Sequence, residues 1–282
     1  MSAKLSDKTA VRAPDRSGTR LGDALHNHVK EKLGRGEVVA SMTVRLIRGI
    51  EIARLAKTAG FDCLYVDLEH SSFSLETTGR ICIAALEAGI TPLVRVPGTG
   101  VVQRILDAGA LGIIAPHVRS AGQARDYVRA AKYPPLGERS YAGPLPHLHY
   151  RSLPPAKASA AIDAATMVIV QFESADAIAN AEDIVALDGV DMVLIGTNDL
   201  LADWGLPGQY NHPRVREAYA TTIAACRKHG EHVAVGGLSA RPDLAAECVR
   251  MGARFVSTGT DIGFLIAAMA AKAKEVHDMA LQ

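Results

Sequence analysis

Acidic residues stand at the ends of three apolar segments of this chain. The runs 64–70, 168–173 and 192–199 read LYVDLEH, VIVQFE and MVLIGTND, and each is mostly apolar until its last residues. A buried strand has no structural need for a carboxylate at its end, and an unpaired buried charge is costly. The repetition predicts a site that holds a cation and transfers protons.

Glu173 and Asp199 are the candidate metal ligands. They follow consecutive predicted strands, and neighbouring parallel strands lie about 4.8 Å apart, so both carboxylates can reach one ion. Two acids without a paired histidine favour a hard cation such as Mg²⁺ or Mn²⁺. In the alternative interpretation each acid caps the helix that follows it, where Ser174 competes with Glu173. The spacing alone favours neither interpretation.

Asp67, Glu69 and His70 end another strand and could move a proton. The two acids, two residues apart, point to the same side, and a carboxylate beside a histidine orients the ring and raises its basicity. Alternatively, His70 is a surface residue before a helix that begins at the serines of 71–74. Taken alone, this plainer interpretation is favoured.

Arg95 lies inside an apolar run, where its charge must find an anion. It can pair with Asp67 or Glu69, or it can bind a substrate oxyanion at the end of its strand. Asp107, by contrast, is expected to be a solvated residue late in a helix.

Several further positions have a simpler interpretation. The segments 236–237 and 257–259 end two later strands and could bind an anion through backbone N–H groups, or serve only as turns. Four histidines have no evident partner and are treated as loop residues: His117, His147, His149 and His212.

A recurring local pattern predicts the elements that position these residues. A helical stretch ends at a glycine, and a short β-branched run that is apolar on both faces follows, as after Gly60, Gly89 and Gly189. Glycine takes the left-handed conformation that closes a helix, and such runs are typical of parallel strands covered by helices. Eight of them predict a (β/α)8 TIM barrel with its site at the strand ends; a doubly wound open sheet is the alternative. The predicted strands are 38–43, 64–67, 92–96, 112–116, 167–172, 192–196, 233–237 and 255–259.

Composition narrows the class of protein. The 282 residues are 48% hydrophobic without a composition break, so residues 21–282 are predicted to form one domain, after a disordered tail over 1–20. A net charge of +1 and few aromatics argue against binding to nucleic acid or a membrane surface, and no apolar run is long enough to span a membrane. Four scattered cysteines predict buried, reduced thiols and a cytoplasmic protein.

In their order and spacing, these segments resemble the HpcH/HpaI aldolase family, the metal-dependent class II pyruvate aldolases. The resemblance covers most of the chain, from about residue 50 to about residue 265. The stretches that carry it are 59–62, 67–70, 94–97, 106–110, 130–139, 171–174, 189–200 and 212–213.

The resemblance implies a (β/α)8 barrel that binds a divalent metal ion and a 2-oxo acid. Glu173 and Asp199 would hold Mg²⁺, Mn²⁺ or Co²⁺, which the acid chelates. Gln171 and the backbone around Asn198 would contact this substrate, and Arg95 would stabilise the enolate oxygen.

The resemblance also implies how the proton moves and how subunits assemble. His70, oriented by Asp67, would transfer the proton, and Asp107 would support its basicity from a neighbouring subunit, which reverses the plain interpretation given above. The family's assemblies imply a homo-oligomer, a trimer or hexamer, in which the C-terminal helix 261–278 packs on another chain.

The implied function is an aldolase that converts a 4-hydroxy-2-oxo acid into pyruvate, or a close analogue, and an aldehyde. Alternatives on the same fold are a CoA-ester lyase of the citramalyl type, a 2-oxo acid decarboxylase, and a barrel that binds a 2-oxo acid without turnover. Four positions near the expected pocket depart from the family pattern and bear on substrate identity: Ser140, Thr197, Asn198 and Leu201.

Overall fold

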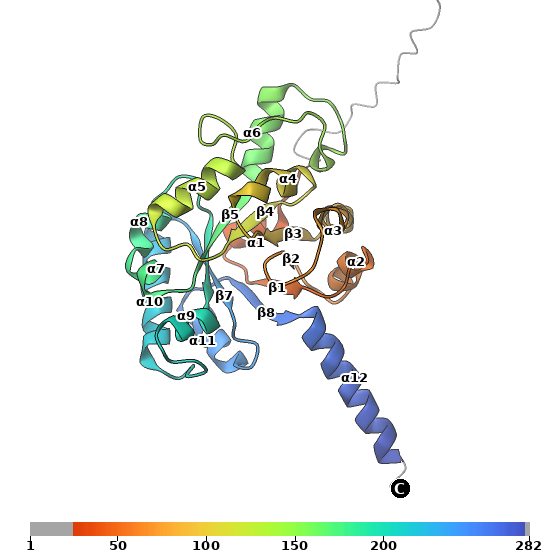
Figure 1. The fold of residues 1–282 in the computed structure, drawn as a ribbon, viewed down its shortest axis with the longest axis vertical. Helices are drawn as coiled ribbons and strands as arrows, with labels where there is room; N and C mark the ends of the chain where they lie inside the picture. Colours follow the sequence, from red (N-terminus) through yellow and green to blue (C-terminus); the bar gives the residue numbers. More distant parts are fainter. Residues whose placement is uncertain (1–24, 280–282) are drawn as a thin grey trace, which may run out of the picture.

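The computed structural model describes residues 25–279 as a closed barrel of eight parallel strands (Figure 1). The strands are β1 Val39–Val44, β2 Cys63–Asp67, β3 Thr91–Arg95, β4 Gly112–Ala115, β5 Met167–Phe172, β6 Met192–Gly196, β7 His232–Gly236 and β8 Phe255–Thr260. Each strand pairs with the next, and β1 also pairs with β8. The predicted barrel is therefore confirmed, and the open sheet is wrong. The predicted tail 1–20 lies outside the described residues, and the division into a tail and one domain stays a prediction.

Helices connect the strands, and most of them cover the outside of the barrel, whereas α12 projects from it (Figure 1). They are α1 His28–Gly34, α2 Glu51–Thr58, α3 Leu75–Ala88, α4 Val102–Asp107, α5 Ala121–Ala131, α6 Pro155–Ala165, α7 Ala175–Ala179, α8 Ala181–Val185, α9 Thr197–Asp203, α10 Pro213–His229, α11 Pro242–Met251 and α12 Asp261–Asp278. Ser74 and Ser174 accept backbone hydrogen bonds at the starts of α3 and α7. Gly89 ends α3 in the left-handed conformation, as predicted from the pattern.

The core has two parts, one on each face of the sheet. Alternate strand residues point to opposite faces, so Leu64 and Val94 pack outward in the layer shared with the helices. Tyr65 and Leu93 instead fill the barrel interior together with Val29 of α1. Because both faces are covered, every residue of β2 to β6 is buried. This rigid frame positions the residues that follow each strand.

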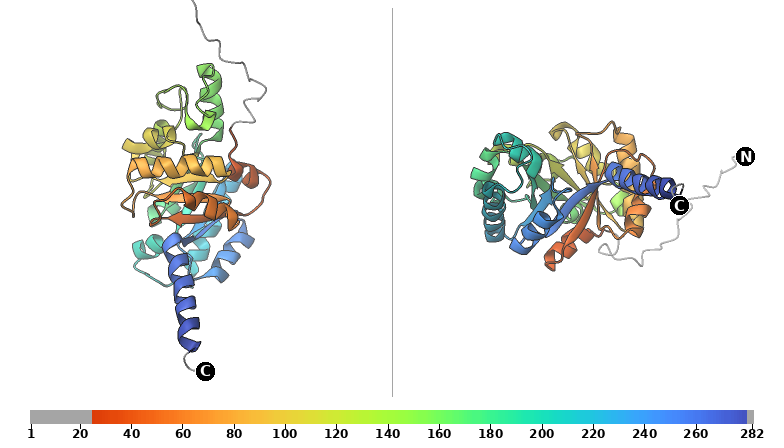
Figure 2. Two further views of the ribbon diagram at one scale, coloured as in Figure 1. Left: turned by 90° about the vertical axis from the view of Figure 1, so that its right-hand side faces the viewer. Right: turned by 90° about the horizontal axis from the view of Figure 1, so that it is seen from below.

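Helix α12 extends away from the barrel (Figure 2). Its large apolar residues are exposed, namely Ile262, Phe264, Leu265, Ile266, Met269 and Val276. Nothing in residues 25–279 qualifies as a membrane-crossing helix, because none combines the necessary length with the necessary apolar character.

His147 was expected to be a plain loop residue, but the structure buries it. It lies in the 3₁₀ turn Pro146–Leu148, within the long loop between α5 and α6, and only 3% of it is exposed. Its Nε2 donates a hydrogen bond of 2.9 Å to the carbonyl of Ala110, whereas its Nδ1 has no partner among residues 25–279. Burial lowers the pKa of His147 to about 4, so the ring is neutral in the folded protein at pH 7.

We expect this histidine to make the protein less stable in acid. The unfolded chain binds the proton near pH 6.5 and the folded chain only near pH 4, so stability is lost as the pH falls through this window. At pH 5 the loss in the free energy of unfolding is about 2 kcal/mol relative to pH 7.5. Urea titrations at several pH values would measure it.

The matched variant is His147→Gln, whose amide can still donate to the Ala110 carbonyl but does not titrate. Its free energy of unfolding should depend less on pH between 7.5 and 5 than that of the parent protein. Equal pH dependence in the two proteins would contradict the assignment.

Candidate active site

The carboxyl ends of the strands surround a cavity of about 280 Å³ at the mouth of the barrel. Arg45, Arg95, Gln171 and Asp199 line it, and they come from the ends of β1, β3, β5 and β6. A second cavity, of about 730 Å³, lies between the loops after β3 and β4 and helix α5. His117, whose ring contacts the carboxylates of Glu69 and Glu173, lines this second cavity.

Glu173 is held as a carboxylate acceptor rather than as a helix cap. Gln171 Nε2 donates to its Oε1, and the backbone N–H of His117 donates to its Oε2 at 3.1 Å. A Cβ at Gly196 would lie 2.8 Å from Oε1, so glycine is required there to leave room for the acid. Ser174 caps α7 instead, and the capping interpretation of Glu173 is therefore wrong.

The pKa of Glu173 reflects a buried carboxylate among other acids, an environment that a positive charge would stabilise. Burial raises its pKa to about 7, and the nearby carboxylates of Asp199 and Glu69 act in the same direction, while His117 opposes them. Asp199 lies in the first turn of α9, where no side chain caps the helix. Asp199 lines the cavity, whereas Glu173 lies against Gln171 and Gly196, which line it. The role of the two acids as metal ligands stays a prediction.

Asp67 forms the centre of a buried ion-pair network. Arg95 donates to it from Nε at 2.9 Å and from Nη2 at 2.6 Å, and Arg45 Nε donates at 2.7 Å. Burial acts to raise the pKa of this carboxyl, but its hydrogen bonds and ion pairs with both arginines hold the pKa below its ordinary value. Arg95 also contacts Glu69 through Nη1 at 3.0 Å.

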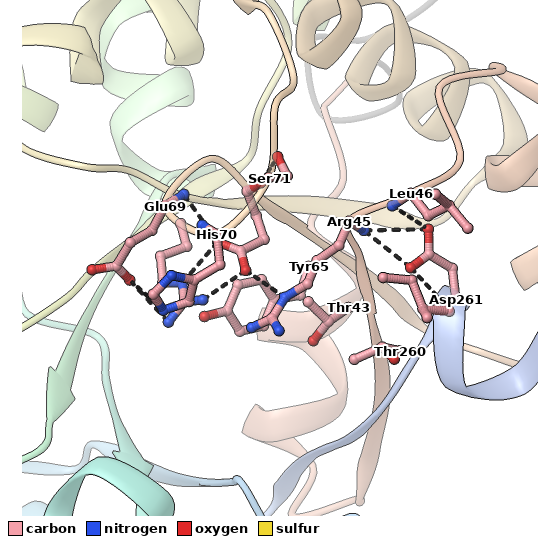
Figure 3. Close-up of polar contacts among 12 residues, drawn as sticks. Thr43, Arg45, Leu46, Tyr65, Glu69, His70, Ser71, Thr260 and Asp261 are labelled. Carbon is pink, nitrogen blue, oxygen red and sulfur yellow. Dashed lines mark hydrogen bonds and ion pairs between the residues drawn. The ribbon is translucent and has the colours of Figure 1, made fainter.

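His70 is not oriented by Asp67 in the way that the resemblance implied. The backbone N–H of His70, not its ring, donates to Asp67 Oδ1 at 3.3 Å, because both carboxylate oxygens already bind guanidinium groups. The ring is half exposed and lies closest to Glu69, with Nε2 at 3.8 Å from Oε2 (Figure 3). Asp67 therefore supports the turn that carries His70, and the acid beside the ring is Glu69.

Two functional candidates were missed by the sequence analysis. His117 joins Glu69 and Glu173, with Nε2 at 2.8 Å from the first carboxylate and Nδ1 at 2.9 Å from the second. Arg45 follows β1, which was predicted to end at residue 43 and extends to Val44. Both residues follow a barrel strand, so the same strand-end rule would have found them.

The remaining predicted residues are divided between the cavity and its surroundings. Gln171 lines the cavity and accepts from Tyr65 Oη at 3.4 Å. Asn198 lines it too, and its side chain accepts from Tyr210 Oη at 2.7 Å. Asp107 lies elsewhere, paired with Arg139 Nη2 at 2.7 Å, so a single chain does not bring it to His70.

Of the four departures from the family pattern, only Asn198 lines the barrel-mouth cavity. Thr197 is fully buried, where its hydroxyl donates to the Gly236 carbonyl at 2.8 Å. Leu201 packs in the core between sheet and helices, and Ser140 is exposed in the long loop. Thr197, Leu201 and Ser140 thus lie outside the walls of this cavity, contrary to the expectation that all four lie near the pocket.

The arrangement can hold a cation by oxygen atoms and neutralise a developing anion with arginine. Among residues 25–279, no group of three or more His, Cys, Asp or Glu side chains forms a ready metal cage. A cation at Glu173 and Asp199 would therefore depend on oxygen atoms of water or substrate for its other ligands.

The closed barrel, with acids and arginines at the carboxyl ends of its strands, has the arrangement found at the active sites of barrel enzymes. A family model described as HpcH/HpaI aldolase/citrate lyase matches residues 49–268. The chain belongs to this family, as the sequence analysis predicted.

The relatives include named aldolases. The chain is 40% identical over 247 residues to a 4-hydroxy-4-methyl-2-oxoglutarate aldolase of Hapsidospora irregularis, covering 86% of this chain and 92% of that protein. It is 33% identical to a 2-keto-3-deoxy-L-rhamnonate aldolase of Escherichia coli, covering 84% and 88%. The crystal structure of an HpcH/HpaI aldolase from Desulfitobacterium hafniense superposes with a TM-score of 0.83 at 31% identity, covering 89% and 97%. The predicted class of enzyme, an aldolase, is confirmed.

Proposed function

We propose that this protein is a divalent-metal-dependent aldolase that cleaves 4-hydroxy-2-oxo acids to pyruvate and a second carbonyl compound. The observation that supports the proposal is that Asp199, Arg95 and Gln171 line one cavity, while the carboxylate of Glu173 accepts a hydrogen bond from Gln171. The named activity of the Hapsidospora irregularis relative makes 4-hydroxy-4-methyl-2-oxoglutarate the first substrate to test.

The residues present fit a divalent ion. Glu173 and Asp199 supply two carboxylates, the donor type that Mg²⁺ and Mn²⁺ prefer, and Gly196 leaves the space that the Glu173 carboxylate occupies. When bound there, the ion would act as a Lewis acid toward the 2-oxo acid. The identity of the ion, whether Mg²⁺, Mn²⁺ or Co²⁺, is part of the proposal.

The chain's own residues then account for the cleavage. A base, proposed to be His70 with Glu69 beside its ring, accepts the proton of the C4 hydroxyl. The C3–C4 bond breaks, its electron pair moves toward the C2 oxygen, and the C4 fragment leaves as a carbonyl compound. Arg95 stabilises the developing charge on that oxygen, and protonation at C3 completes pyruvate.

Removal of metal is expected to abolish this activity. After exhaustive chelation with EDTA, pyruvate release from 4-hydroxy-4-methyl-2-oxoglutarate should fall to background, because the C2 oxygen loses its strongest electrophile. Mg²⁺, Mn²⁺ or Co²⁺ should restore it, as measured with a coupled lactate dehydrogenase assay. Activity that survives chelation would contradict the proposal, and CO₂ release from oxaloacetate without any aldol cleavage would favour a decarboxylase.

The proposed assembly is a homo-oligomer, a trimer or hexamer, with α12 exchanged between subunits. An 18-residue helix that exposes six large apolar residues away from its own barrel is costly in a monomer. An apolar groove of about 270 Å³, lined by residues such as Ile52, Leu55 and Phe61, lies at the base of this helix. In such an assembly Asp107 would reach the active site of a neighbouring subunit.

The cytoplasmic location of the protein also stays a prediction.

A further inference from the structure

Arg45 offers charged donors to the cavity that the proposed cleavage does not use. Its Nε is bound to Asp67, and one third of its side chain is exposed. Within residues 25–279 its two terminal nitrogens, Nη1 and Nη2, have no hydrogen-bond partner, although the residue lines the cavity that Asp199 also lines. An arginine whose two terminal nitrogens are unpaired beside a substrate cavity is suited to binding a carboxylate.

The backbone of Arg45 is held firmly in place. The carboxylate of Asp261 accepts from the backbone N–H groups of Arg45 at 3.1 Å and Leu46 at 2.8 Å (Figure 3). It also accepts from the backbone N–H of Ile47 at 2.8 Å. Asp261 itself is 2% exposed at the start of α12. The Arg45 residue is therefore held at its backbone by Asp261 and at its Nε by Asp67, which lowers the entropy lost when a ligand binds.

The cavity wall beside Arg45 is polar and made of small residues. Thr43, Ser257 and Thr260 line it, from the ends of β1 and β8. Thr43 Oγ1 and Ser257 Oγ lie 3.4 Å apart, so both hydroxyls occupy the same corner. Each hydroxyl can donate to a carboxylate, and an apolar substituent in this corner would leave Nη1 and Nη2 of Arg45 without a partner.

We propose that Arg45 and the hydroxyls of Thr43, Ser257 and Thr260 form a subsite for a second carboxylate, on the part of the substrate that leaves as the second product. The enzyme then prefers dicarboxylic 4-hydroxy-2-oxo acids to otherwise similar monocarboxylic acids. This inference rests on the proposed function, because it assumes that the 2-oxo acid end lies at Glu173 and Asp199. In this proposal the residues of β1 and β8 that line the cavity bind the second carboxylate of the substrate.

The test compares two substrates that differ at one group. The dicarboxylic substrate is 4-hydroxy-4-methyl-2-oxoglutarate. The monocarboxylic substrate is 4-hydroxy-4-methyl-2-oxopentanoate, which has a methyl group in place of the C5 carboxylate. Cleavage of either acid releases pyruvate. Metal-loaded parent protein should prefer the dicarboxylic acid. Arg45→Gln should lower kcat/KM for the dicarboxylic acid about 10- to 100-fold, mainly through KM, because a charge-assisted hydrogen-bonded pair is lost. The effect on the monocarboxylic acid should be at least tenfold smaller.

Two further variants control the test. Arg48→Gln changes a neighbouring arginine that contacts Ser72 and the ring of Phe73, outside the cavity, and it should leave the ratio of the two kcat/KM values unchanged. Arg45→Lys keeps the charge but loses the planar guanidinium, and it should lower the preference for the dicarboxylic acid about three- to tenfold. This variant tests the subsite even if Arg45→Gln does not fold.

The outcomes separate the two proposals. If the parent protein cleaves both acids and the Arg45 variants lower both values equally, Arg45 serves only Asp67 and the subsite is wrong. A parent protein without preference for the dicarboxylic acid also refutes the subsite while leaving the aldolase function intact. If the metal-loaded parent cleaves neither acid, the proposed function fails and the subsite falls with it.

Discussion

Replacing Glu173 with glutamine is expected to remove both metal binding and aldol cleavage. The variant keeps the size of the side chain but loses one of the two proposed carboxylate ligands, and neutral amides are poor substitutes for an anionic ligand of Mg²⁺. Metal affinity and kcat/KM should each fall by at least about 100-fold. Titration calorimetry with Mn²⁺ and pyruvate release would measure the two losses.

The buried position of Glu173 also provides a test that the variant is folded. Because burial raises the pKa of this carboxyl from 4.5 to about 7, it costs the metal-free protein stability as the pH rises through that window. The metal-free Glu173→Gln protein should therefore be at least as stable at pH 8 as the parent protein. A thermal melt at this pH separates a lost ligand from a lost fold.

Glu231 gives the matched control. Burial raises its pKa to about 7 as well, but it lies just before β7, at the opposite end of the barrel from the cavity. Glu231→Gln should leave metal affinity and kcat/KM unchanged. Full metal binding by the Glu173→Gln protein would refute the proposed ligand.

Replacing Arg95 with lysine is expected to lower kcat about 10²- to 10³-fold while metal binding is retained. Arg95 is 4% exposed and contacts Asp67 through two nitrogens and Glu69 through a third. Lysine keeps the charge but cannot span both carboxylates and also face the cavity. Loss of one group that stabilises an oxyanion typically costs this much in kcat.

The control for this prediction is a surface arginine with the same kind of contact. Arg216 donates to Glu247 from Nε at 2.7 Å and from Nη2 at 2.8 Å, on the outside of the barrel. Arg216→Lys should leave kcat and KM within about twofold of the parent values, because exposed pairs contribute little. If Arg95→Lys retains kcat within threefold as well, Arg95 is a structural residue and the proposed mechanism loses its oxyanion stabiliser.

Much of the fold could be predicted because its signals are local. Glycines after helices and runs that are apolar on both faces located all eight strands to within a few residues. The site followed from one rule, that a barrel enzyme works at the carboxyl ends of its strands. This rule selected Glu173, Asp199 and Arg95, which the structure brings to one end of the barrel.

What could not be predicted depends on contacts between residues far apart in the chain. The ring of His70 lies beside Glu69 rather than Asp67 because Arg45 and Arg95, from two other strands, occupy both oxygens of Asp67. His117 is linked to Glu173 across 56 positions, and no spacing pattern encodes such a pair.

The barrel, the family, and the acids and arginine at the strand ends could all be inferred from the amino-acid sequence. Helix caps, strand periodicity and strand-end residues are short-range properties, so they can be recognised in the sequence alone. The pairing of the charges, the burial of His147 and the terminal nitrogens of Arg45 at the cavity, unpaired among residues 25–279, are apparent only in the folded chain. Ion pairing and burial depend on three-dimensional proximity, which barrel closure creates when it brings β8 beside β1.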